Sequence, residues 1–207
     1  MYRALTCLLV SGVVSLAACG DNSTAPEDEL TADEVGFLAS QIEATFTGVL
    51  DDYFDQTGGD PSNAPALTHV PVVWTRSFER SRPCHDGGTL TVTGGGTTTW
   101  DAQAVTNDVE SSGTKTRTNC AYTQTDGVVI TLNGTGTWDH ERHYLNNAPT
   151  GTWITMFAGS FTWTRPGETG DTCTYDLIRT VDTAANTRTL IGTSCGNDVD
   201  KSGTWRG

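Results

Sequence analysis

In the last two thirds of the chain, apolar and polar residues alternate, and this alternation constrains the fold more than any other feature. Leu90 and Val92 share one parity, as do Ile130 and Leu132. A period of two places successive side chains on opposite faces of a β-strand. Turn-forming pairs such as Asp126-Gly127 separate the alternating segments. The pattern predicts about eight to ten short strands joined by tight turns.

The composition leads to the same fold class. The chain has 23 glycines and six tryptophans among 207 residues, and threonine is abundant in the alternating segments. Threonine and tryptophan favour strands, and glycine favours turns, so a helical bundle is excluded. We predict a mainly β fold, either an antiparallel meander, a sandwich or an open barrel, with one N-terminal amphipathic helix. The predicted antiparallel β domain covers residues 66–207.

The amphipathic helix is predicted over residues 31–57. Thr31 and Glu34 have the spacing of a capping box, in which each side chain accepts a hydrogen bond from the other's backbone N–H. Apolar residues then recur every three or four positions from Val35 to Phe54. We expect this apolar stripe to pack against the β domain rather than to bind a partner.

Charge is distributed unevenly along the chain. The formal net charge is −13, which argues against a nucleic-acid-binding protein, because phosphate contacts need a basic surface. Eleven acidic residues and no Lys or Arg lie between residues 21 and 60. We interpret these acids as a solvated face that keeps the protein soluble.

The N-terminus has the three parts of a secretory signal. Arg3 is followed by an apolar segment that is too short for a stable transmembrane helix, and small residues come next. The segment ends in Leu16-Ala17-Ala18-Cys19, which resembles the lipobox of bacterial lipoproteins. The resemblance implies cleavage before Cys19, attachment of diacylglycerol (hence palmitate) to its sulfur and acylation of its amino group. Gly20 stands where an Asp implies inner-membrane retention, so the resemblance implies the outer membrane.

This resemblance also assigns the segments before the helix. Residues 1–18 are interpreted as a lipoprotein signal peptide, and residues 19–30 as an acidic tether between lipid and helix. The expected partner is membrane lipid, reached through the acylated Cys19. A further partner, either an envelope protein or a glycan, is not identified by the sequence.

Four of the six cysteines lie beyond the predicted lipidation site. An even number of cysteines in an exported protein predicts two disulfides. A zinc site is disfavoured because the sequence has no C-x-x-C pair. Four cysteines allow three pairings, and we favour the one that joins strand ends locally: Cys84–Cys120 and Cys173–Cys195.

Tryptophan repeatedly follows small or β-branched residues, as in Gly134-Thr135-Gly136-Thr137-Trp138. Exposed rings on a sheet bind sugars by stacking, whereas buried rings form a core. We predict that the tryptophans belong to the core. The alternative is a weak ligand-binding face formed by Trp100, Trp138 and Trp163.

Two segments have some features of metal sites, but we predict no metal and no cofactor. His140 and His143 are three residues apart, and on a strand they point to opposite faces, so we interpret them as exposed loop histidines. The segment from Asp198 to Gly203 has the opening spacing of a calcium loop. It lacks the later glutamate of such a loop, and we predict a plain turn.

Catalytic motifs are absent from the sequence: it has no G-x-S-x-G, no H-E-x-x-H and no phosphate-binding glycine loop. Glycosidases use a pair of carboxylates, and the candidates are Glu79, Glu110, Asp139 and Glu141, although their spacing does not indicate a pair. We therefore predict a non-enzymatic, lipid-anchored envelope protein with a structural or binding role. The alternatives are a carbohydrate- or lipid-binding module and, third, an envelope hydrolase.

Overall fold

The computed structural model describes residues 29–57 and 71–205. The signal peptide, Cys19 and nearly all of the predicted tether lie outside the described residues. The described residues form one helix and eight strands: α1 (Ala32–Thr57), β1 (Val72–Pro83), β2 (Thr89–Asp101), β3 (Thr106–Thr123), β4 (Val129–Leu145), β5 (Ala148–Arg165), β6 (Glu168–Asp182), β7 (Thr187–Ser194) and β8 (Asn197–Thr204).

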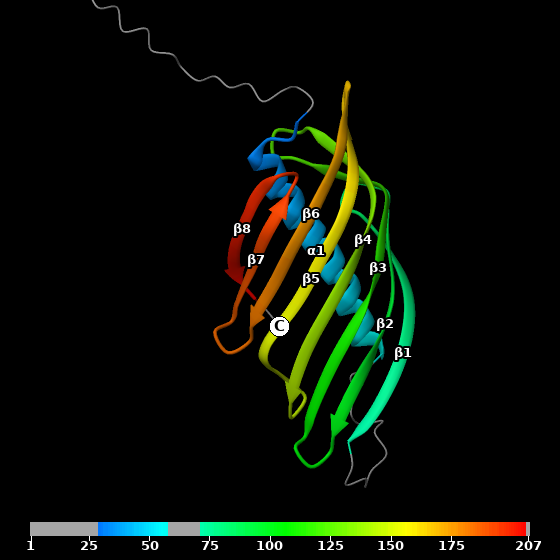
Figure 1. Cartoon of the computed structure of the whole chain (residues 1–207), viewed down its shortest axis with the longest axis vertical. Helices are drawn as coiled ribbons and strands as arrows, with labels where there is room; N and C mark the ends of the chain where they lie inside the picture. Colours follow the sequence, from blue (N-terminus) through cyan, green and yellow to red (C-terminus); the bar gives the residue numbers. More distant parts are fainter. Residues whose placement is uncertain (1–28, 58–70, 206–207) are drawn as a thin grey trace, which may run out of the picture.

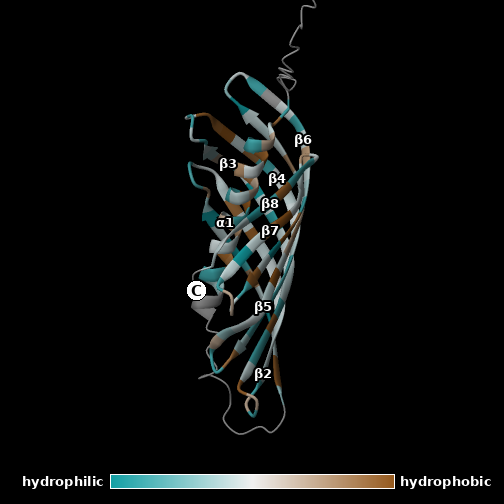
Figure 2. Cartoon of the chain, turned by 90° about the vertical axis from the view of Figure 1, so that its left-hand side faces the viewer, coloured by the Kyte–Doolittle hydropathy of each residue, from teal (hydrophilic) through white to brown (hydrophobic). Residues whose placement is uncertain are grey.

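The eight strands form one antiparallel sheet in which the spatial order is the sequence order. The mainly β class is confirmed, and of the three predicted architectures the structure has the meander, with β1 and β8 as its edges (Figure 1). The strands are longer than the short segments expected, and β3 and β5 each have 18 residues. Hydrophobic and hydrophilic residues alternate along them in Figure 2.

Helix α1 runs diagonally across one side of the sheet, which curls around it (Figure 1). It contacts both edge strands as well as β2 and β7. Its apolar stripe is buried, and the Phe46 ring lies 5.0 Å from that of Phe157 and 5.4 Å from that of Trp138, measured between centroids. This confirms that the stripe packs against the sheet. We call the side of the sheet that α1 covers the inner face, and the other side the outer face.

The start of α1 has the predicted capping box. The backbone N–H of Thr31 donates to the Glu34 carboxylate at 2.7 Å, and that of Glu34 donates to Thr31 Oγ1 at 3.3 Å. These bonds satisfy N–H groups that have no partner within the helix. Within the part of the chain that the structure describes, no helix is long and apolar enough to span a bilayer.

Both predicted disulfides are present. Cys84–Cys120 joins the end of β1 to β3, with a Cα–Cα distance of 5.3 Å. Cys173–Cys195 joins β6 to the turn between β7 and β8, with a Cα–Cα distance of 4.7 Å. Two disulfides in a small domain are typical of an oxidising, exported environment.

Glycines inside the strands make room for large inner-face side chains. A Cβ on Gly94 would lie 2.5 Å from an indole carbon of Trp138, and one on Gly136 would lie 2.3 Å from the Tyr175 hydroxyl. Both distances are shorter than any real carbon contact, so only glycine fits at these positions. Glycine at these positions therefore lets the Trp138 ring and the Tyr175 hydroxyl approach the backbone closely.

Candidate functional site

The Lys and Arg side chains of the described strands all lie on one face of the sheet. In each described strand, the Lys and Arg residues share the parity of the residues that face α1, such as Phe78 in β1 and Trp138 in β4. Among the described residues, no Lys or Arg occupies an outer-face position. The inner-face cations are Arg76, Arg80, Arg82, Lys115, Arg117, Arg142, Arg165, Arg179, Arg188 and Lys201.

Four acids of α1 pair with five of these arginines. Glu43 is the most enclosed, and it accepts hydrogen bonds from Arg179 Nε at 2.7 Å and from Arg188 Nη1 at 2.9 Å. The other pairs are Glu34–Arg165 at 2.7 Å, Asp51–Arg142 at 2.6 Å and Asp52–Arg82 at 3.4 Å. The prediction that the acids of this segment form a solvated face is therefore wrong for Glu34 and Glu43, which the sheet encloses, whereas the side chains of Asp51 and Asp52 are still exposed to solvent.

His140 belongs to this inner network. It is buried in β4, where its Nδ1 lies 2.7 Å from Thr155 Oγ1 and its Nε2 accepts a hydrogen bond from Arg142 Nε at 2.5 Å. Burial lowers the pKa of His140 well below its ordinary value, and the charges of Arg142 and Arg179 lower it further. The prediction of an exposed loop histidine is therefore wrong for His140, whose ring is neutral and structural.

His143 lies on the outer face, as the strand geometry requires. Its Nδ1 is 2.8 Å from Asp108 and its Nε2 is 3.1 Å from Glu141, so the ring bridges two carboxylates of neighbouring strands. Across residues 29–57 and 71–205, no cluster of three or more His, Cys, Asp or Glu is arranged to hold a metal ion. The segment from Asp198 to Gly203 lies within β8, so the prediction of a turn there is wrong.

The three tryptophans considered for ligand binding do not form an exposed platform. Trp138 and Trp163 are 1% and 3% exposed, and Trp100 is half-buried. The Trp138 indole N–H donates to the backbone oxygen of Thr114 at 3.2 Å, and the guanidinium of Arg165 lies 5.2 Å from the Trp163 ring. Trp138 and Trp163 are therefore core residues and leave no free ring for a sugar.

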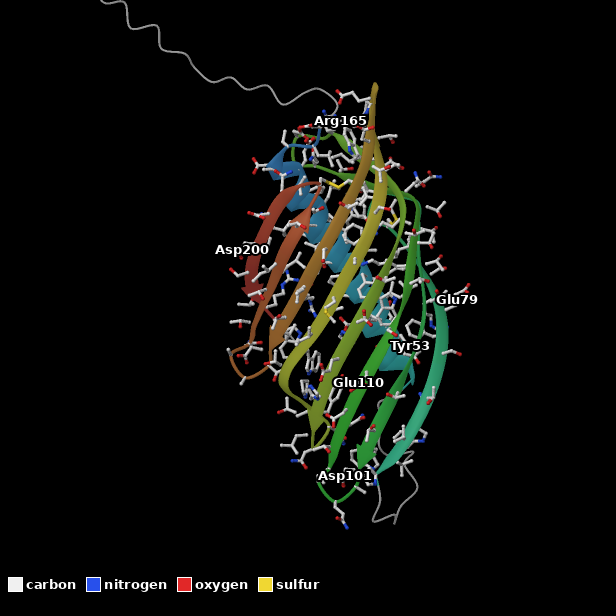
Figure 3. The ribbon with its side chains drawn as sticks, viewed as in Figure 1. Tyr53, Glu79, Asp101, Glu110, Arg165 and Asp200 are labelled. Atoms are coloured by element: carbon white, nitrogen blue, oxygen red, sulfur yellow. A yellow bond between two sulfur atoms is a disulfide. The ribbon has the colours of Figure 1, made fainter. Side chains whose placement is uncertain are left out.

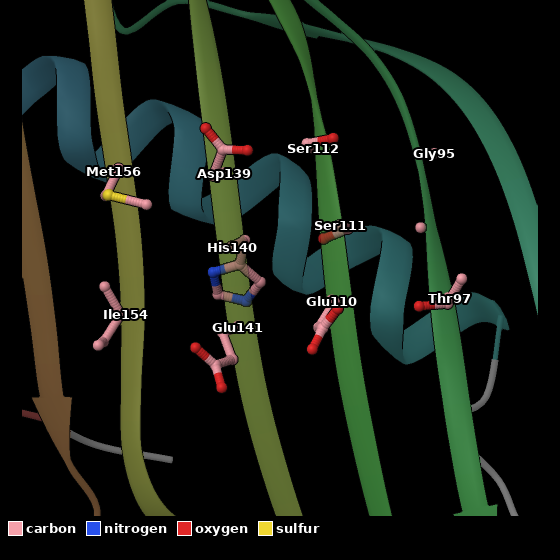
Figure 4. A pocket seen from close by; sticks show the side chains of 11 residues that line it. Gly95, Thr97, Glu110, Ser111, Ser112, Asp139, His140, Glu141, Ile154 and Met156 are labelled. Atoms are coloured by element: carbon pink, nitrogen blue, oxygen red, sulfur yellow. The ribbon is translucent and has the colours of Figure 1, made fainter.

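A groove of about 390 Å³ crosses β2–β5, and the side chains that line its outer part are the candidate functional site (Figure 4). Glu110 on β3 lies directly opposite Glu141 on β4, and Ser112 lies opposite Asp139 in the next row. The fourth acid considered for pairing, Glu79, lies apart from them on β1 (Figure 3). We call this site the outer groove; its outer-face residues are Gly95, Thr97, Glu110, Ser112, Asp139, Glu141, Ile154 and Met156.

An apolar row extends the outer groove toward the C-terminal strands. Met156, Ile178 and Ile191 are direct cross-strand neighbours on β5, β6 and β7, and they are 47%, 45% and 52% exposed. The same row begins at Asp139 and ends at Asp200. The outer groove and the row together form a surface with an acidic part and an apolar part.

Sequence reasoning missed this surface, although a signal for it exists. The Lys and Arg residues of the strands share the parity of the large apolar residues, as Arg179 does with Leu177, and most of the strand acids have the other parity, as Asp176 does. Which outer-face residues become cross-strand neighbours depends on the register of the strands, and the sequence alone does not fix this register. Comparisons with protein-family models, with curated proteins and with solved structures found no match for this chain.

Proposed function

We propose that this chain is a lipid-anchored protein of the bacterial outer membrane that acts by binding a partner, with the outer groove as its binding surface. The observation that carries the proposal is the combination of three carboxylates with an exposed apolar row on one sheet face. The anchor is supported by the lipobox-like Leu16-Ala17-Ala18-Cys19, and export is supported by the two disulfides.

The chemistry of the surface favours a basic partner with apolar side chains. Among the described strands the outer face has acids and no Lys or Arg, so its field attracts cationic surfaces and repels acidic ones. The row of Met156, Ile178 and Ile191 supplies the apolar contact that specific interfaces bury. We therefore propose a protein segment in which lysine or arginine alternates with aliphatic residues.

Binding is favoured over catalysis by the shape of the site. Glu110 and Glu141 lie on an open sheet surface (Figure 4). Enzymes that use paired carboxylates gain from enclosing the substrate and excluding water. An open acidic groove is instead suited to reversible electrostatic association.

A defined peptide tests the groove. A fluorescent peptide of alternating Lys and Leu is titrated with the full chain, and its anisotropy is followed. We expect the double variant Glu110→Gln/Asp139→Asn to weaken binding about tenfold, because two close ion pairs are lost. The control Glu79→Gln/Asp198→Asn has the same net charge and should bind as the wild type does. An equal loss of peptide affinity in both variants would mean that net charge alone controls binding, and it would refute the outer groove as the binding site.

A separate experiment tests the anchor. Cells expressing the wild type or Cys19→Ser are labelled with palmitate and fractionated. Label should enter the wild type, which should be found in the membrane fraction, and should be absent from the variant. An unlabelled wild-type chain in the soluble cell interior would refute the anchor and would leave the peptide result unaffected.

A further inference from the structure

Two inner-face cations on β3 are not neutralised by α1. Lys115 and Arg117 are 0% and 2% exposed. Within the described part of the chain neither has a carboxylate partner, in contrast to the five arginines that pair with the helix. The Lys115 Nζ lies 4.3 Å from the centroid of the Phe157 ring and 5.1 Å from that of Tyr175. Aromatic faces therefore provide its electrostatic contacts.

The guanidinium of Arg117 has a hydrogen-bond partner on one side only, among the residues described. Its Nη1 donates to the Tyr175 hydroxyl at 3.4 Å. Its Nε and Nη2 are buried, and neither has a hydrogen-bond partner among the residues described. These two nitrogens form one edge of the planar guanidinium, with N–H bonds that run parallel. This edge matches the two oxygens of a carboxylate or a phosphate.

The two cations respond differently to burial. Burial lowers the pKa of Lys115 well below its ordinary value, and the nearby charge of Arg117 lowers it further. Lysine relieves its burial by releasing a proton, whereas a guanidinium stays charged in proteins. Arg117 therefore keeps a buried positive charge, and native structures pair such charges.

We infer that Arg117 is the anchor of an internal oxyanion site, in which its free Nε/Nη2 edge holds the carboxylate or phosphate group of a ligand. The site lies on the inner face and is independent of the outer groove. The cross-strand neighbours of Arg117 are Leu90 on β2 and Gly134 on β4.

Thermal unfolding of the full chain tests the site. Phosphate, acetate and laurate (below its micellar concentration) are added separately at an ionic strength kept constant with sodium chloride. At least one should raise the unfolding midpoint of the wild type in proportion to the logarithm of its concentration. A response to phosphate or acetate identifies a free ion as the ligand, and a response to laurate alone identifies an amphiphilic acid.

Arg117→Met is the decisive variant. It should lose the oxyanion response, and without ligand its midpoint should equal or exceed that of the wild type, because an unpaired buried charge has been removed. The control Arg188→Met removes the same charge from a half-exposed site and should keep the response. The inference is wrong if the wild type responds to none of the three probes, if Arg188→Met also loses the response, or if Arg117→Met unfolds at a lower temperature without ligand.

Discussion

Glu43 joins the helix to two arginines of the sheet. Its carboxylate is buried and accepts hydrogen bonds from Arg179 and Arg188. In Glu43→Gln the carboxylate charge is lost, and the guanidinium of Arg179 stays buried without its counter-charge. Breaking one partner of a buried ion pair costs about 3–5 kcal/mol, and we expect a loss of that size in the free energy of unfolding measured with urea.

Asp33 provides the matched control for this measurement. It lies in the first turn of the same helix and is exposed. Asp33→Asn removes one negative charge near the positive end of the helix dipole and should cost less than about 1 kcal/mol. If both variants lose the same free energy, the helix charge and not the buried pair controls stability.

His140 should make stability depend on pH. Its pKa in the folded protein lies well below 6.5, whereas in the unfolded chain it is close to 6.5. Below pH 6.5 the unfolded state therefore binds a proton that the folded state does not, so stability is full above pH 6.5. Below it, stability falls by up to about 1.4 kcal/mol per pH unit until the folded-state pKa is reached. Urea unfolding between pH 5 and 8 should show this slope.

Two variants assign the slope to His140. His140→Gln should have a flatter profile below pH 6.5 than the wild type, because glutamine does not titrate there. His143→Gln removes a histidine from the outer face and should keep the part of the slope that His140 causes. An unchanged slope in His140→Gln would contradict the assignment.

At the scale of elements, the sequence predicted those features that local chemistry determines. The capping residues Thr31 and Glu34 and the apolar stripe fixed the helix, and two-residue alternation with turn signals fixed the β class. The burial of His140 and Arg142 was not predicted, because a pattern-based prediction assumes that the strand positions facing the core are apolar. Their partners Thr155 and Asp51 come from other elements, so only the fold brings them together.

Each of the two disulfides is expected to contribute to the free energy of unfolding. They close loops of 36 and 22 residues, and chain entropy assigns each about 3–4 kcal/mol. Replacing Cys84 and Cys120 with serine should lower the free energy of unfolding by about that amount, and so should replacing Cys173 and Cys195. Peptide mapping without reductant should recover the two native pairs. Mapping that finds four free thiols in protein isolated without reductant would disprove both bonds.

The whole molecule is divided by the sheet into two electrostatic environments. On the inner face, arginines pair with the acids of α1 in a largely buried setting. On the outer face, Glu110 and Glu141 lie directly opposite each other, and no Lys or Arg of the described strands lies among the acids. Salt screens exposed charges far more than buried pairs. The two faces should therefore respond differently to ionic strength.

This difference predicts the sign of the salt effect on stability. Raising sodium chloride from about 0.02 M to about 0.5 M shortens the screening length several-fold. Repulsion between outer-face acids then weakens while the inner pairs persist, so the free energy of unfolding should rise. Glu110→Gln/Asp139→Asn already lacks part of that repulsion, so it should be more stable at low salt and gain less from added salt. A fall in wild-type stability with salt would mean that attraction between helix and sheet is the screened interaction, and that the ion pairs of α1 are open to solvent.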